Sequence, residues 1–227
     1  TSNNPLAPEA FGSILFPTHH IMKLNLNARI RFGQTYTTTP RGKYNNYSNK
    51  YPSLRLNYQK GFAATESGYG YDFFNVNIRQ NLNLSRFGTL SYRIDGGLFL
   101  NEEGISFLDF KHFNGNQTRV NSGESYVGRF NLLPYYDRST NQNNSEFHFE
   151  HNFEGFVMNR IPLLKHLKSN LVLGAKSLLI DGFTPYHEVS LGLDRLGFGK
   201  FRFLRLDYVV PYDGGWQNGA LIFGLTF

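Results

Sequence analysis

The sequence has 227 residues, a formal net charge of +6, no cysteine and 16% aromatic residues. This length suits one large β domain or two small ones, and the lack of cysteine excludes disulfides and thiolate metal sites. Mean hydropathy is −0.39, and no apolar run approaches the ~18 residues that a membrane-spanning helix needs. The positive charges are spread along the chain rather than gathered in a run, so we expect no binding of nucleic acid.

The N-terminal part alternates between irregular and strand-like stretches. Residues 1–20 contain three prolines and are expected to form an irregular lead-in. Because the sequence starts at Thr1 without a signal peptide, we expect a mature form or a fragment. Residues 23–33 form the clearest amphipathic strand, with a length that suits a tilted membrane strand. The polar residues 34–50 are expected to form a long external loop.

Alternation of apolar and polar residues recurs along the rest of the chain, in segments of about 8–14 residues that exceed the ~5–6 residues of a typical soluble strand. Residues 101–124 interrupt this pattern, and the other connections read as sequential hairpins. The even number of strands is typical of bacterial single-chain membrane barrels. We therefore predict an all-β fold: a single domain over residues 1–227 that forms an antiparallel transmembrane β-barrel of about ten strands, possibly the C-terminal part of a larger barrel. The expected strands are 23–33, 53–60, 71–84, 89–100, 125–136, 144–154, 169–180, 186–196, 203–211 and 219–227.

The last expected strand, residues 219–227, places large apolar side chains on one face and ends on an aromatic residue. Side chains of a membrane barrel alternate between lipid and lumen, and aromatic girdles lie at both interfaces. A terminal aromatic strand also resembles the signal by which outer-membrane barrels are recognised for assembly. The alternative is the last core strand of a soluble sandwich. The predicted lipid-facing residues are Leu24, Leu26, Ile30, Phe223, Leu225 and Phe227.

The opposite face of the strands carries unevenly distributed charge. The N-terminal strands supply cations, whereas residues 146–150 supply two carboxylates and a histidine. In a closed barrel the basic and acidic walls would face each other across the lumen. Such a lumen is either a charged conduit that selects anions or orients a plug, or a narrow interior held shut by ion pairs and asparagines. The predicted lumen-facing residues are Lys23, Arg29, Arg31, Arg55, Arg79, Arg93, Glu146, His148 and Glu150.

Several polar residues are candidates for catalytic or metal-binding groups. In a strand, His148 and Glu150 share a face while His151 points away, so only two metal ligands converge. No nucleophile elbow or clear carboxylate dyad is present. We therefore predict no catalytic residue, no metal and no cofactor. The residues considered for a barrel enzyme are Ser106, Asp109 and His112, or Asp95 with Glu102 and Glu103.

Three stretches together resemble a known group of proteins: residues 108–118 with their Gly-Asn-Gln-Thr, residues 151–164 with Asn-Arg-Ile-Pro-Leu-Leu, and residues 203–211 with the strand after them. They resemble outer-membrane barrels that carry a carboxypeptidase-regulatory-like domain ahead of the barrel. The last hairpin is also similar to the end of the outer-membrane insertase and two-partner-secretion transporter superfamily. The Arg-Gly-Phe-type motif of the insertases is absent from residues 137–143, and no regulatory-like domain precedes the strands. The resemblance implies the C-terminal barrel portion of a longer protein.

We accordingly expect a barrel of the bacterial outer membrane that serves transport, secretion or assembly, with outer-membrane lipid and the assembly machinery as partners and no enzymatic activity. Its substrate is unknown. Two alternatives remain open: a small closed structural or adhesive barrel that displays external loops, and a soluble β-barrel or sandwich that binds a ligand. If the last residue lies at the periplasmic side, strand alternation places residues 155–168 there too. The segments then expected outside are 34–50, 85–88, 137–143, 181–185 and 213–218, with 101–124 inside.

Overall fold

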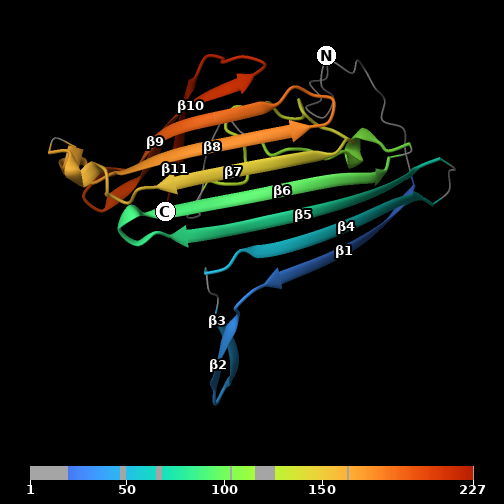
Figure 1. Ribbon diagram of the computed structural model, residues 1–227, viewed down its shortest axis with the longest axis horizontal. Helices are drawn as coiled ribbons and strands as arrows, with labels where there is room; N and C mark the ends of the chain where they lie inside the picture. Colours follow the sequence, from blue (N-terminus) through green and yellow to red (C-terminus); the bar gives the residue numbers. More distant parts are fainter. Residues whose placement is uncertain are drawn as a thin grey trace.

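The chain is organised around one antiparallel sheet of nine strands (Figure 1). The computed structural model describes residues 20–46, 50–64, 68–102, 104–115, 126–162 and 164–226. Every strand of the sheet pairs with the next one along the chain, apart from a small hairpin placed between the first two. The sheet contains β1 (Ile21–Arg31), β4 (Ser53–Ala63), β5 (Gly70–Asn83), β6 (Thr89–Asn101), β7 (Asn144–Asn152), β8 (Asn170–Ile180), β9 (Tyr186–Phe198), β10 (Phe201–Asp213) and β11 (Ala220–Leu225).

The remaining elements are short. Strands β2 (Thr35–Thr39) and β3 (Gly42–Asn46) pair with each other in a hairpin that Figure 1 shows below β1 and β4. The described parts of the connections contain four 3₁₀ turns: η2 (Ser85–Phe87), η3 (Phe107–Asp109), η4 (Met158–Arg160) and η5 (Leu164–Leu167). Within the described ranges, no helix is long and apolar enough to cross a membrane.

The prediction of an all-β, antiparallel fold is confirmed, but the nine strands do not close into a barrel. Strands β1 and β11 are the two edges of the sheet in the described part of the chain. The expected lead-in, residues 1–20, lies almost entirely outside the described residues.

Register sorts the side chains of the sheet by polarity. One row across neighbouring strands joins Arg79, Arg93, His148, Lys176 and Glu188. We call this side the polar face. A neighbouring row on the opposite side, the apolar face, contains Ile30, Leu54, Ile78, Ile94 and Phe147. The separation follows from the alternation in the sequence, because successive residues of a strand point to opposite faces.

We call the long connection between β6 and β7, residues 102–143, the inserted segment, and its described parts, 104–115 and 126–143, contact the polar face. The prediction of a strand at 125–136 is wrong, because the described part of this stretch joins other residues only through isolated bridges such as that between Gly115 and Phe130. Positive φ angles at Gly128 (98°) and Tyr136 (64°) interrupt extended backbone. Phe130 instead packs into an apolar cluster with Phe113, Leu133, Leu178, Ile180 and Tyr186.

The missing strand changes which connections share an end of the sheet. Because each strand reverses direction, the β2–β3 hairpin in 34–50 and the turn at 85–88 lie at the same end as 155–168. The inserted segment lies at the opposite end, with 181–185. The predicted placement of 34–50 beside 181–185 is therefore wrong, since it counted one strand too many between them.

Candidate functional site

The polar face of the sheet carries the charged residues that the sequence singled out. Register and alternation place all nine predicted lumen-facing residues on this face, in the order Lys23, Arg29, Arg31, Arg55, Arg79, Arg93, Glu146, His148 and Glu150. Its two halves differ in charge. Strands β1 and β4 contain no Asp or Glu, and the one carboxylate of β5, Asp72, lies on the apolar face. From β6 onward, carboxylates on the polar face are numerous and buried: Asp95, Glu146, Glu150, Glu188, Asp194 and Asp207.

Glu188 on β9 binds the backbone of the inserted segment. Its carboxylate is 1% exposed and accepts the backbone N–H groups of Asn131 at 2.7 Å and Leu132 at 2.8 Å. It also accepts the hydroxyl of Tyr186 at 2.8 Å. Lys176 lies 3.8 Å from the carboxylate and donates to the Asn131 side chain at 2.7 Å. A buried carboxylate is stable only when such donors surround it, so this contact fixes the position of the segment.

Arg205 on β10 forms a second anchor. Its guanidinium bonds the carboxylates of Glu150 at 2.9 Å and Asp207 at 2.8 Å. The guanidinium carbon also lies 4.1 Å from the ring centroid of Tyr126 in the inserted segment, within cation–π range. The Tyr126 backbone N–H donates to Glu150 at 3.3 Å, and its hydroxyl donates to the carbonyl of Leu225 at 2.7 Å. Tyr126 is thus held both through its backbone N–H and through its side-chain hydroxyl.

Glu146 and His148 on β7 are also used by the fold. Lys111 of the inserted segment lies 3.0 Å from Glu146, and His148 Nε2 lies 3.4 Å from the same carboxylate. His151 lies on the other side of the strand, where its Nε2–H donates to the Phe87 carbonyl at 2.9 Å. Glu146 and Glu150 thus bond to Lys111 and Arg205, and the facing of basic and acidic walls across a closed lumen stays a prediction.

Asp109 in η3 ties the inserted segment to the N-terminal strands. Its carboxylate accepts from the ammonium of Lys23 on β1 and from the hydroxyl of Tyr69. Burial, together with this neighbouring carboxylate, raises the pKa of the Tyr69 phenol. The phenol therefore remains a proton donor to Asp109 throughout the physiological range.

The residues considered for a barrel enzyme have separate structural partners. Ser106 accepts the Leu108 N–H at 3.5 Å and caps η3. His112 Nδ1 lies 2.8 Å from the hydroxyl of Ser139, and burial lowers the pKa of its imidazole. The structure thus gives Ser106, Asp109 and His112 three different sets of contacts. In the second set, Asp95 binds Arg93 and Asn77, Glu102 accepts from Gln142, and Glu103 lies outside the described residues.

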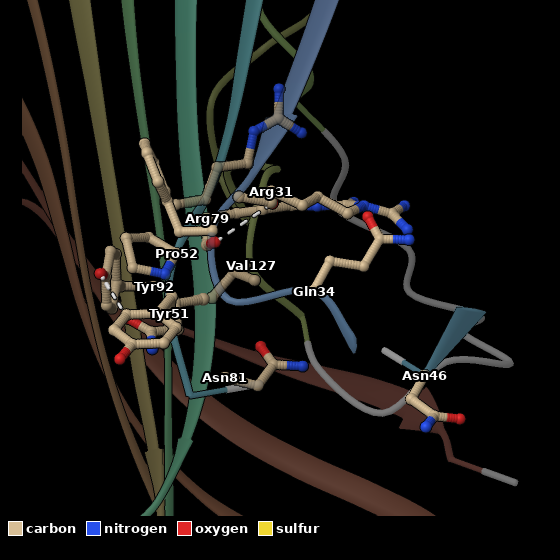
Figure 2. A pocket seen from close by; sticks show the side chains of 13 residues that line it. Arg31, Gln34, Asn46, Tyr51, Pro52, Arg79, Asn81, Tyr92 and Val127 are labelled. Atoms are coloured by element: carbon tan, nitrogen blue, oxygen red, sulfur yellow. Dashed lines mark hydrogen bonds between the residues drawn. The ribbon is translucent and has the colours of Figure 1, made fainter. Parts of the chain in front are cut away.

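The basic half of the polar face borders a cavity of about 470 Å³. Figure 2 shows Arg31 and Arg79 at this cavity, with Gln34 and Tyr51 from the β1–β4 connection. Val127 of the inserted segment also lines it. The sequence predicted the arginines, but Gln34 and Val127 were missed. No local sequence pattern identifies these residues, because each is brought to the cavity by the course of its loop.

The chain matches the family model described as "Family of unknown function (DUF5686) C-terminal domain" over residues 1–193. This match covers well over half of the sequence. The chain belongs to this family. No match was found among curated proteins or among solved structures. The DUF5686 match includes the basic strands and the whole inserted segment and ends within β9. The family description names neither a carboxypeptidase-regulatory-like domain nor an insertase, so those resemblances stay predictions.

The apolar face of this DUF5686 domain exposes large side chains. Leu24, Leu26 and Ile30 on β1 are exposed, as is Phe223 on β11, with exposed fractions of 56% for Leu26 and 72% for Phe223. Leu225 is half-buried, and the side chain of Phe227 lies outside the described residues. The exposed set continues across the central strands with Leu98, Phe149, Leu173, Val189, Leu191, Leu204 and Tyr208.

Proposed function

We propose that this domain is a membrane-embedded β-barrel portion of a bacterial outer-membrane protein, with its apolar face toward lipid. The observation that carries the proposal is the distribution of polarity across the sheet. From β6 onward, charged side chains are buried with partners on one face, while leucines, valines and phenylalanines are exposed on the other. A half-exposed antiparallel sheet in water normally has the reverse arrangement. Lipid on the outside and a polar interior account for both faces.

The open edges of the sheet add a condition to this proposal. In hydrocarbon, the backbone groups of β1 and β11 would need partners, since unsatisfied edges do not occur there. Nine strands in alternating directions leave β1 and β11 running the same way, so direct pairing between them would be parallel. An odd number of further strands gives an all-antiparallel barrel with an even total, as bacterial single-chain barrels have. We therefore place these nine strands within a larger barrel.

For the activity of the barrel, we propose transport or secretion across the outer membrane, with the inserted segment as an internal plug. The basic half of the polar face and its cavity would supply a charged path beside the segment. The second candidate is a sealed structural barrel that displays its connections. The buried anchors at Glu188 and Arg205 favour that candidate, because they hold the segment firmly on the sheet. Ion conductance across a planar bilayer separates the two: a measurable conductance supports transport, and an insulating barrel supports the structural role.

The membrane assignment is tested by substitution on the two faces. Leu26→Arg and Phe223→Arg place a charge on the apolar face, at a cost of about 2–4 kcal/mol near the midplane of a bilayer. Asn25→Arg is the matched control, because Asn25 alternates with Leu26 and lies on the polar face. The protein is expressed with a signal sequence and assayed for outer-membrane fractionation and a heat-modifiable band on gels. Both apolar-face variants should lose assembly while Asn25→Arg keeps it. A soluble monomer that needs no detergent would overturn the proposal.

A further inference from the structure

The arginines on the polar face of β1, β4, β5 and β6 lie in like-charged pairs. Arg29 lies directly opposite Arg55, and Arg79 lies directly opposite Arg93. Like charges that face each other across neighbouring strands destabilise a sheet. Two such pairs side by side give this part of the polar face an excess of positive charge, which an anion would offset.

Among the described residues, the ion pairs of these arginines are unevenly distributed. Arg93 is bonded to Asp95 at 2.6 Å. In contrast, no described carboxylate lies within salt-bridge distance of Arg29, Arg55 or Arg79. The sequence explains this difference, since β1 and β4 contain no Asp or Glu and the one carboxylate of β5 points to the apolar face. In the other half of the face, Arg205 has two carboxylate partners.

The cavity of about 470 Å³ lies against this group of arginines. Its volume falls within the range of small-molecule sites. Arg31, Arg79 and Arg93 line it from three strands. Gln34, Asn46 and Asn81 add amide groups that can donate further hydrogen bonds (Figure 2). Tyr51 forms part of the wall. The cavity thus combines several cations with neutral donors.

We propose that this cavity binds a ligand that carries phosphate. A guanidinium matches phosphate through paired N–H···O bonds, and a phosphate monoester carries about −1.5 to −2 charges at pH 7. One phosphate group therefore offsets more of this cluster than one carboxylate does. The ligand is either a phosphorylated solute or the phosphorylated headgroup of a lipid. The site deepens the proposed function, because it would make the barrel interior selective for phosphorylated compounds, but binding itself requires only the folded sheet.

The test is calorimetric titration of the purified protein in a neutral detergent. Inorganic pyrophosphate represents a solute, and mixed micelles containing phosphatidic acid represent a lipid headgroup. Arg79→Gln removes a cavity arginine, and Arg195→Gln is the control, because Arg195 is exposed on β9 and does not line the cavity. We expect binding of at least one probe, weakened tenfold or more in Arg79→Gln and unchanged in Arg195→Gln. Tighter binding of pyrophosphate identifies a solute site, and tighter binding of the micelles identifies a lipid site.

Three results would overturn the assignment: no binding of either probe, equal binding in Arg79→Gln, or equal binding of sulfate in place of pyrophosphate. If neither probe binds and Arg79→Gln also lowers the melting temperature, a group of the chain itself compensates the arginines. The membrane proposal is judged separately, by Leu26→Arg and Phe223→Arg. If those variants lose assembly but the protein binds no phosphate, only the phosphate-binding inference fails. If a soluble monomer binds phosphate, only the barrel proposal fails.

Discussion

Glu188→Gln is expected to release the inserted segment from the sheet. The carboxylate accepts two backbone N–H groups, from Asn131 and Leu132, at 2.7 and 2.8 Å. The amide of glutamine keeps one acceptor oxygen, but its NH₂ group would face an N–H donor. Hydrogen bonds to charged groups contribute about 1.5–3 kcal/mol each, and breaking a buried ion pair from one side costs about 3–5 kcal/mol. We take about 3 kcal/mol as the loss in docking free energy, which corresponds to a roughly 150-fold increase in the open population.

Hydrogen–deuterium exchange of the peptide around residues 129–133 measures this opening directly, because Asn131 and Leu132 lose their acceptors. The protein is kept in the detergent used for purification. Glu102→Gln is the matched control, since Glu102 is exposed and accepts only a side-chain bond from Gln142 at 3.1 Å. Faster exchange of about 100-fold or more is expected in Glu188→Gln alone. Unchanged exchange in that variant would refute the idea that the carboxylate holds the segment.

Two further predictions concern the inserted segment. Gly224→Ala places a Cβ 2.7 Å from the Tyr126 hydroxyl, so the variant should lose about 1 kcal/mol and melt about 2–4 °C lower. Gly215→Ala, which meets nothing within 4 Å, should melt as wild type, and equal melting of both variants would contradict this packing. Because burial lowers the pKa of His112, its contribution to docking is complete above the ordinary value of about 6.5 and is lost as the pH falls from there toward the lower folded value. The Thr140 N–H donates to the carbonyl of Lys111, the residue before His112, at 3.0 Å. Exchange at this amide, corrected for intrinsic rate, should therefore speed up as the pH falls from 7.5 to 5.5. In His112→Gln this pH dependence should disappear, and its persistence would assign the effect to another group.

Most of the sheet was predictable because strand patterning is local. Alternation along residues 23–33 or 144–154 needs no knowledge of distant residues. The same rule produced the error at 125–136. Tyr126, Gly128 and Phe130 are buried in alternation, but the reason is that an extended loop lies on the sheet, not that it pairs within it. Alternation of apolar residues indicates which side chains are buried. It does not distinguish a paired strand from a loop that lies across a sheet.

The candidate site was predictable only in its charges. Alternation placed Arg79 and Glu150 on one face, because register preserves sidedness from strand to strand. Their partners depend on the path of the inserted segment, which carries no repeating pattern. The backbone N–H groups that Glu188 accepts are invisible in a sequence, since every residue except proline has one. For the same reason Glu188 was not singled out, although it has a central role among the anchors.

The hydrogen-bonding partners that the sheet offers to residues 126–132 come late in the chain. Glu150, Lys176, Glu188 and Leu225 supply hydrogen bonds and Arg205 a cation–π contact, and all five follow the segment in sequence. As the chain is made, the segment is therefore complete before its anchors exist, and Tyr126 lacks its partners Glu150, Arg205 and Leu225 until the later strands follow. Docking can finish only when β9 to β11 join the sheet. The last hairpins thus both extend the sheet and hold a segment that was synthesised earlier. Truncation at the C-terminal end would therefore disturb the inserted segment as well as the edge of the sheet.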